Sequence, residues 1–98
     1  MYKTGSLTLL ILLFAVQLFA QSVDDLIKKS EELYDKFDNN GVLKVLEQAD
    51  KQSPDNWEVL WRLSRTCVDI AEHMSSDKED EQLKLYEKGL EYANRSIK

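Results

Sequence analysis

The sequence predicts an all-α domain of antiparallel helical hairpins that follows an apolar N-terminal leader helix. The chain has 98 residues with only three glycines and one proline, so few positions interrupt a helix. Apolar residues recur at steps of three and four between residues 54 and 71, which is the spacing of one helix face. A second stretch, residues 23–37, matches this one after a shift of 34 residues.

Charge and cysteine content exclude several classes of function. The net charge is −5, which argues against nucleic acid and against anionic membrane surfaces, because both require a basic face. The chain has one cysteine, Cys67, which permits no internal disulfide and is too few for a zinc site. We therefore expect no metal and no cofactor.

Residues 1–21 have the layout of a signal peptide or of an N-terminal membrane anchor. Lys3 supplies a positive start, an apolar run extends from Leu7 to Val16, and Ala20 precedes the first polar residues. The run is shorter than the ~20 residues of a membrane-spanning helix, which favours a signal peptide cleaved after Ala20. We expect an exported protein, periplasmic or secreted. The alternative is a membrane anchor through residues 7–20, and we expect membrane contact only through this segment.

Residues 22–53 form the first predicted hairpin. Ser22 and Asp25 make a capping box at the start of its first helix. Residues 38–41 are expected to break the helix, with Gly41 supplying a positive φ. A shorter amphipathic helix follows from Val42 to Ala49. The first helix has an apolar face of seven residues: Val23, Leu26, Ile27, Ser30, Leu33, Tyr34 and Phe37.

Residues 54–98 form a second, longer hairpin. Asp55 is the expected cap of its first helix, paired with Glu58, and Trp57 is expected to pack into the core against the first hairpin. Small Ser64 and Cys67 leave a groove on this helix that can receive another helix closely. The predicted face comprises Trp57, Leu60, Trp61, Ser64, Cys67, Val68 and Ala71.

The closing helix of the second hairpin aligns with that of the first only after a shift of 47 residues, which places Gly89 on Val42. The additional 13 residues fall around residues 73–85, so we expect both helices of the second hairpin to be longer. Ser76 and Glu79 form a further capping box. The closing helix has an apolar face at steps of three and four, made by Leu83, Tyr86, Leu90, Ala93 and Ile97.

The 34-residue period resembles that of the tetratricopeptide repeat. Leu26 aligns with Leu60 and Ser30 with Ser64, and Pro54 stands between the units. A helix-turn-helix unit of this length is typical of that repeat. The resemblance implies that residues 22–98 stack as tetratricopeptide-like units of an α-solenoid.

A more specific resemblance is to the regulator of microtubule dynamics family. It depends on Glu58-Val59-Leu60-Trp61-Arg62-Leu63-Ser64-Arg65 and on Tyr86-Glu87-Lys88-Gly89-Leu90-Glu91-Tyr92-Ala93, which closes the elongated hairpin, and it covers residues 26–98. It implies several such repeats, so the chain is expected to be a fragment of a longer protein. It also implies an association with microtubules.

The candidate binding surface is the groove that the first helices of the two hairpins line in repeats of this kind. Its aromatic and aliphatic residues would be fringed by acidic side chains, so we expect a protein or peptide ligand with apolar anchors and basic flanks. The function expected is that of a non-catalytic protein-interaction scaffold. The predicted groove residues are Ile27, Glu31, Tyr34, Trp61, Arg65, Val68 and Asp69.

Alternatives from other classes remain at this point. Residues 36–47 resemble a calcium-binding helix-loop-helix, but Lys36 stands where the first aspartate ligand belongs. His73 is isolated near the elbow and Cys67 has no base beside it, so neither is expected to be catalytic. A third reading is a hydrolytic or transferase domain completed by further sequence.

Overall fold

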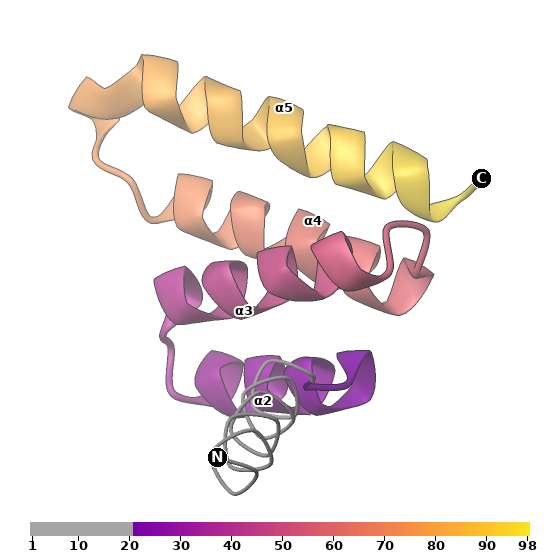
Figure 1. Ribbon diagram of the computed structural model, residues 1–98. Coiled ribbons are helices and arrows are strands. Elements are labelled where there is room, and N and C mark those ends of the chain that lie inside the picture. The colour runs from indigo at the N-terminus through magenta and orange to yellow at the C-terminus, as the bar shows by residue number, and fades with distance from the viewer. Residues whose placement is uncertain (1–20) are drawn as a thin grey trace, which may run out of the picture.

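Figure 1 shows the computed structural model, which describes residues 21–98 and contains helices without strands over that range. The prediction of an all-α fold is confirmed for these residues, and successive helices run in opposite directions (Figure 1). The elements are α2 (Val23–Asp35), α3 (Asn39–Gln52), α4 (Trp57–Glu72), the 3-10 helix η1 (Ser76–Lys78) and α5 (Glu79–Ser96).

The predicted leader lies outside the described residues, so its helix, its cleavage after Ala20 and its anchoring role stay predictions. From residue 21 onward, no helix combines the length and the apolar character needed to cross a membrane.

Three helices begin after a residue whose polar side chain accepts a hydrogen bond from a backbone N–H group. Ser22 Oγ accepts from the Asp25 N–H at 3.1 Å, which confirms that predicted cap. Asp38 Oδ1 caps α3 by accepting from Gly41 at 3.0 Å. The predicted cap at Asp55 is wrong by one residue, because the side chain of Asn56 accepts from the Glu58 N–H at 3.0 Å. Each cap satisfies a donor that the first helical turn leaves open.

The connection between α2 and α3 differs from the prediction. Phe37, not Gly41, has a positive φ, of 61°. Gly41 is helical, and a Cβ there would overlap the capping carboxylate of Asp38, so glycine leaves room for the cap.

The calcium alternative is also wrong. A calcium loop needs irregular backbone whose oxygens converge on the ion, but α3 begins at Asn39 and makes most of residues 36–47 helical. Over the described range, no three His, Cys, Asp or Glu side chains gather closely enough to hold a metal.

The core lies between the helices and is centred on α3 and α4. Leu26 of α2, Leu46 of α3 and Leu60 of α4 are almost fully buried. The expected core position of Trp57 is wrong, because this side chain is 58% exposed. The buried face of α4 is rotated away from Trp57 and is formed by Val59, Leu60, Leu63, Thr66, Cys67 and Ala71.

The predicted groove over Ser64 and Cys67 is confirmed, and α5 occupies it. A Cβ added to Gly89 would lie 3.3 Å from the Ser64 carbonyl oxygen and 3.5 Å from Cys67 Cβ. Ser64 Oγ donates to the Gly89 carbonyl at 2.7 Å. Small residues therefore let the two helix backbones approach closely. Burial raises the pKa of the Cys67 thiol.

The second hairpin is longer than the first, as predicted. α4 has 16 residues against 13 in α2, and α5 has 18 against 14 in α3. The predicted capping box at Ser76 is wrong: Ser75 precedes η1 and hydrogen-bonds to Asp77. At the other end of α5, Arg95 forms an ion pair with Asp50 of α3 at 2.9 Å, which ties the two closing helices together.

Candidate protein-binding surface

Arg65 of α4 gathers three residues that the sequence assigned to the groove. Its Nη2 atom lies 3.1 Å from Glu31 Oε1 of α2. Its guanidinium carbon lies 3.8 Å from the centre of the Tyr34 ring and 4.9 Å from that of the Trp61 ring. A guanidinium within about 6 Å of an aromatic centroid is attracted by the ring quadrupole. Glu31, Tyr34, Trp61 and Arg65 thus form one contiguous cluster between α2 and α4.

Arg62 completes this cluster and is not among the predicted groove residues. Its Nε donates to Glu31 Oε1 at 2.7 Å, and its Nη1 donates to Glu58 Oε2 at 2.7 Å. Its guanidinium carbon lies 4.3 Å from the centre of the Trp61 ring. The four-residue spacing of Glu58 and Arg62 is a sequence signal for the second contact. The bond to Glu31 joins residues 31 positions apart and has no local signal.

The two arginines neutralise the acidic fringe at this end of the groove. Burial alone would raise the pKa of the Glu31 carboxyl, but hydrogen bonds and charge from Arg62 and Arg65 outweigh it and lower that pKa. The hydrogen bond from Arg62 likewise lowers the pKa of Glu58. Both carboxyls stay ionised at neutral pH, and each is paired. The cluster is therefore balanced in charge instead of acidic.

One hydrogen-bond donor of the cluster is unsatisfied among the described residues. Arg65 Nε is buried, and within the described part of the chain it has no hydrogen-bond partner. A buried donor without a partner typically costs about 1–3 kcal/mol. The stacking of Arg65 on Tyr34 and its bond to Glu31 offset this cost.

An open depression continues from Tyr34 toward the end of α4. Tyr34, Phe37, Asp69 and His73 line one part of it, which has a volume of about 200 Å³. The wider part, of about 440 Å³, is lined by Phe37, Asp38, Asn39, Asn40, Ile70, His73 and Met74.

Phe37, Ile70 and Met74 were not in the predicted site, although each stands at a chain position where a helix ends. Phe37 follows the last turn of α2, while Ile70 and Met74 flank the end of α4. An alignment of the two hairpins could have found them, because it places the ends of α2 and α4 next to each other.

The other predicted groove residues lie in different places. Asp69 borders the depression. Ile27 is half-buried and packs against the core. Val68 faces the other way, since its Cγ2 would lie 3.4 Å from a Cβ on Gly89 of α5. Its assignment to the groove is corrected: Val68 belongs to the packing between α4 and α5.

The sequence matches known proteins over most of its length. The family model described as "Regulator of microtubule dynamics protein 1-3" matches residues 22–98. "Regulator of microtubule dynamics protein 1" of Bos taurus is 31% identical over 75 residues, which are 76% of this chain and 23% of that protein. The Mus musculus protein of the same name is 32% identical over 75 residues, 76% of this chain and 24% of that protein.

The match covers only part of each relative. The chain spans about a quarter of the length of the curated relatives it matches. No solved structure matches the chain.

These matches overturn the expectation of a periplasmic or secreted protein. The relatives are named as regulators of microtubule dynamics, and microtubules are polymers of the cell interior, so the prediction of export is wrong. The resemblance read from Glu58–Arg65 and from the long second hairpin is confirmed. With a family model that matches residues 22–98, this chain belongs to the regulator of microtubule dynamics family.

Proposed function

We propose that this domain is a non-catalytic protein-interaction module that binds a peptide or helix along α2 and α4. The observation that carries the proposal is the position of Tyr34. It stacks under Arg65 in the cluster and also lines the depression beside Phe37. The balanced cluster and the open depression therefore adjoin as one surface, which suits an extended ligand better than a small molecule.

The depression is the part suited to an apolar anchor. Ile70 and Met74 supply aliphatic and thioether surface, and Phe37 stands at the edge with 90% of its surface exposed. Interfaces gain most of their binding energy where a large apolar side chain fills such a recess. Methionine adapts its shape to different partners.

The charges around the depression favour basic flanks on the ligand. Asp38 and Asp69 border it, and no arginine of the described cluster pairs with either of them. The chain as a whole carries a net charge of −5. Complementary charge increases the association rate and selects among partners more than it adds affinity.

A repeat architecture would place the binding surface on the same two helices. We propose that α2 and α4 are equivalent first helices of two tetratricopeptide-like units. Leu26 and Leu60, which align at a shift of 34 residues, are both buried. First helices in equivalent positions would together form the groove of a solenoid.

Family membership supports a role in microtubule dynamics, as the names of the relatives state it for those proteins. The test of this wider role is co-sedimentation of the full chain with polymerised tubulin. We expect the wild type in the pellet and less of the Phe37→Ala variant. A wild type that stays in the supernatant contradicts the microtubule role and leaves the peptide-binding proposal to its own test.

The peptide-binding proposal is tested by selecting random displayed peptides on the purified full chain and by measuring their affinities calorimetrically. We expect selected peptides to combine apolar residues with Lys or Arg. Phe37→Ala should weaken binding by about tenfold or more, as for an interface anchor, and Asp69→Asn should reduce the salt dependence. Trp57→Ala, an exposed aromatic outside the site, is the matched control and should bind like wild type. Equal affinities for Phe37→Ala and wild type would refute the proposal.

A further inference from the structure

The narrower part of the depression differs in chemistry from the wider part. Two aromatic rings, a carboxylate, an amide and an imidazole line its volume of about 200 Å³, from Tyr34, Phe37, Asn39, Asp69 and His73. The wider part has aliphatic and thioether surface from Ile70 and Met74 instead. The two parts therefore suit different groups of a ligand.

Both hairpins contribute to the narrower part. Its aromatic rings come from α2 and from the α2–α3 connection, and its carboxylate comes from Asp69 near the end of α4. The α2–α3 connection and the end of α4 lie at the same side of the domain (Figure 1). The narrower part thus lies between two described helices and not on the outer face of α2 or α5.

Asp69 is the carboxylate of the depression that can pair with a charge from outside. No lysine or arginine side chain of the described chain lines either part. None of the ion pairs within residues 21–98 involves Asp69. The other aspartate of the depression, Asp38, already accepts a hydrogen bond from the Gly41 N–H at 3.0 Å.

His73 offers a hydrogen-bond acceptor beside this carboxylate. Its Nδ1 atom lies 2.7 Å from the backbone oxygen of Asp69. A carbonyl oxygen only accepts, so Nδ1 carries the hydrogen of this bond and Nε2 of the neutral ring keeps a lone pair. That nitrogen can accept a hydrogen bond from an N–H group of a ligand, while the bond to the last turn of α4 holds the ring in place.

Phe37 adds an aromatic ring that is almost fully exposed. A cation is attracted to the face of such a ring when it lies within about 6 Å of the centre. The ring of Tyr34 is less available, because the guanidinium of Arg65 already stacks on it at 3.8 Å. A free ring next to a free carboxylate is a combination that binds an ammonium or guanidinium group.

We propose that the narrower part is a cation subsite for the side chain of one Lys or Arg of the ligand. Its charged group would lie between the Asp69 carboxylate, His73 Nε2 and the Phe37 ring. This inference rests on the proposed function, because it assigns one residue of the bound peptide. The wider part then receives the apolar anchor. Phe37, Asn39 and His73 line both parts, so the basic residue and the anchor are at most about four residues apart in the ligand.

Calorimetry with a peptide from the displayed selection tests the pairing with Asp69. Each Lys or Arg of the peptide is replaced in turn by norleucine, which has no charge. We expect one replacement to weaken binding to the wild-type full chain by about fivefold or more, because it removes both the cation–π contact and the ion pair. Against Asp69→Asn the same replacement should cost less than about twofold.

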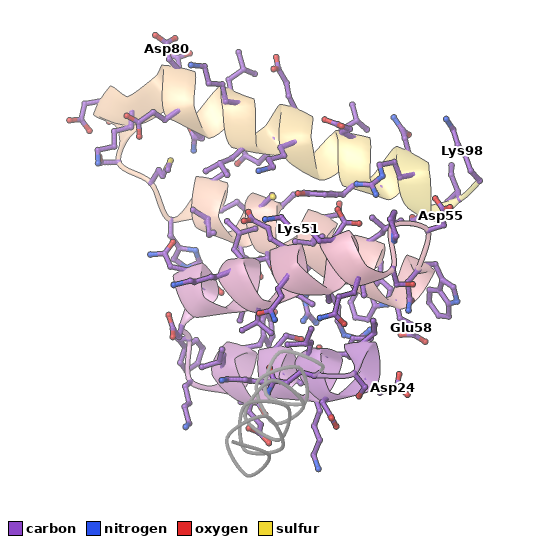
Figure 2. The ribbon with its side chains drawn as sticks, viewed as in Figure 1. Asp24, Lys51, Asp55, Glu58, Asp80 and Lys98 are labelled. Carbon is purple, nitrogen blue, oxygen red and sulfur yellow. The ribbon has the colours of Figure 1, made fainter. Side chains whose placement is uncertain are left out.

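Asp24→Asn is the matched control. Asp24 lies at the start of α2, away from the α2–α3 connection (Figure 2), so in this variant the replacement should cost as much as in the wild type. A cost that is equal in the wild type and in Asp69→Asn overturns the subsite. So does a bound peptide in which no replacement of Lys or Arg matters, and that result leaves the proposed function standing.

A small cation tests the subsite without any peptide. We expect n-butylammonium, which mimics a lysine side chain, to shift the NMR signals of Phe37 and His73 with a dissociation constant of about 10–100 mM. Asp69→Asn should abolish this saturation, and 1-butanol, the uncharged control, should not produce it. n-Propylguanidinium in the same titration compares arginine with lysine, and the cation that binds more tightly identifies the preferred residue. Equal shifts with n-butylammonium and 1-butanol overturn the subsite, whether or not peptides are selected.

Discussion

The guanidinium carbon of Arg65 lies 3.8 Å from the centre of the Tyr34 ring and thereby joins α4 to α2. The most extensive packing between the described helices follows their order in the chain, α2 on α3, α3 on α4 and α4 on α5, whereas α2 and α4 are joined by the side chains of Arg62 and Arg65. The Arg65 cluster fixes the orientation of the two first helices, and hence of the surface that they share.

A double-mutant cycle on Arg65→Ala and Tyr34→Leu should give a coupling free energy of about 0.5–2 kcal/mol, because a partly desolvated cation–π pair is worth that much. The free energy of unfolding in urea is the quantity to measure. A second cycle that pairs Arg65→Ala with Trp57→Leu is the control, and its effects should be additive. Additive effects in the first cycle would show that the stacking contributes no stability.

The stability of the domain should fall in acid through Glu31. Its pKa in the folded state is lowered by Arg62 and Arg65 below the ordinary 4.5. The unfolded state therefore binds more protons in acid, so the contribution of Glu31 is present above pH 4.5 and is lost as the pH falls through the folded pKa. Glu31→Gln should flatten the pH dependence of the free energy of unfolding in that window. Glu32→Gln, an exposed neighbour, should leave it as in wild type.

Substitutions at Gly89 should separate helix propensity from packing. Gly89→Ala gains up to about 1 kcal/mol of helix propensity and meets neighbours at 3.3–3.5 Å, so its net effect on stability should be small. Gly89→Val should destabilise by about 1–3 kcal/mol or more, because the added methyl groups would push α5 from Ser64 and Val68. Thermal unfolding of both variants measures the difference. A valine variant as stable as the alanine variant would show that α5 can shift freely.

Phe37→Gly should stabilise the domain by about 1 kcal/mol, because a side chain at φ 61° is strained and glycine is not. Little packing is lost, since Phe37 is exposed. Phe37→Ala keeps the Cβ and hence the strain, so it should not stabilise. The midpoint of urea unfolding distinguishes the two. If both variants are equally stable, the backbone at residue 37 relaxes without strain.

Local patterns predicted the helices and one of their contacts. The cap at Ser22, the greater length of the second hairpin and the close approach over Ser64 and Cys67 all follow from spacing and residue size. These features depend on residues within a few helical turns of one another, or on small residues, which have few other roles in a helix.

The wrong predictions concern features that depend on how a helix is rotated about its own axis. The apolar spacing predicts that Trp57 lies on the buried face, but the buried face of α4 is centred on Val59 and Leu63. Arg62 was missed because its partner Glu31 lies on another helix. The polar turn predicts a positive φ at Gly41, whereas the structure places it at Phe37. Such features depend on how helices pack, which spacing alone does not determine.

The burial of Cys67 under Gly89 gives the chain a built-in reporter of its own opening. A maleimide dye can reach this thiol only after α5 has lifted from α4, because the side chain is fully enclosed in the closed state. The rate of labelling therefore measures how often the second hairpin opens, and a ligand that holds the hairpin shut would reveal itself by slowing that rate, with no label attached to the ligand.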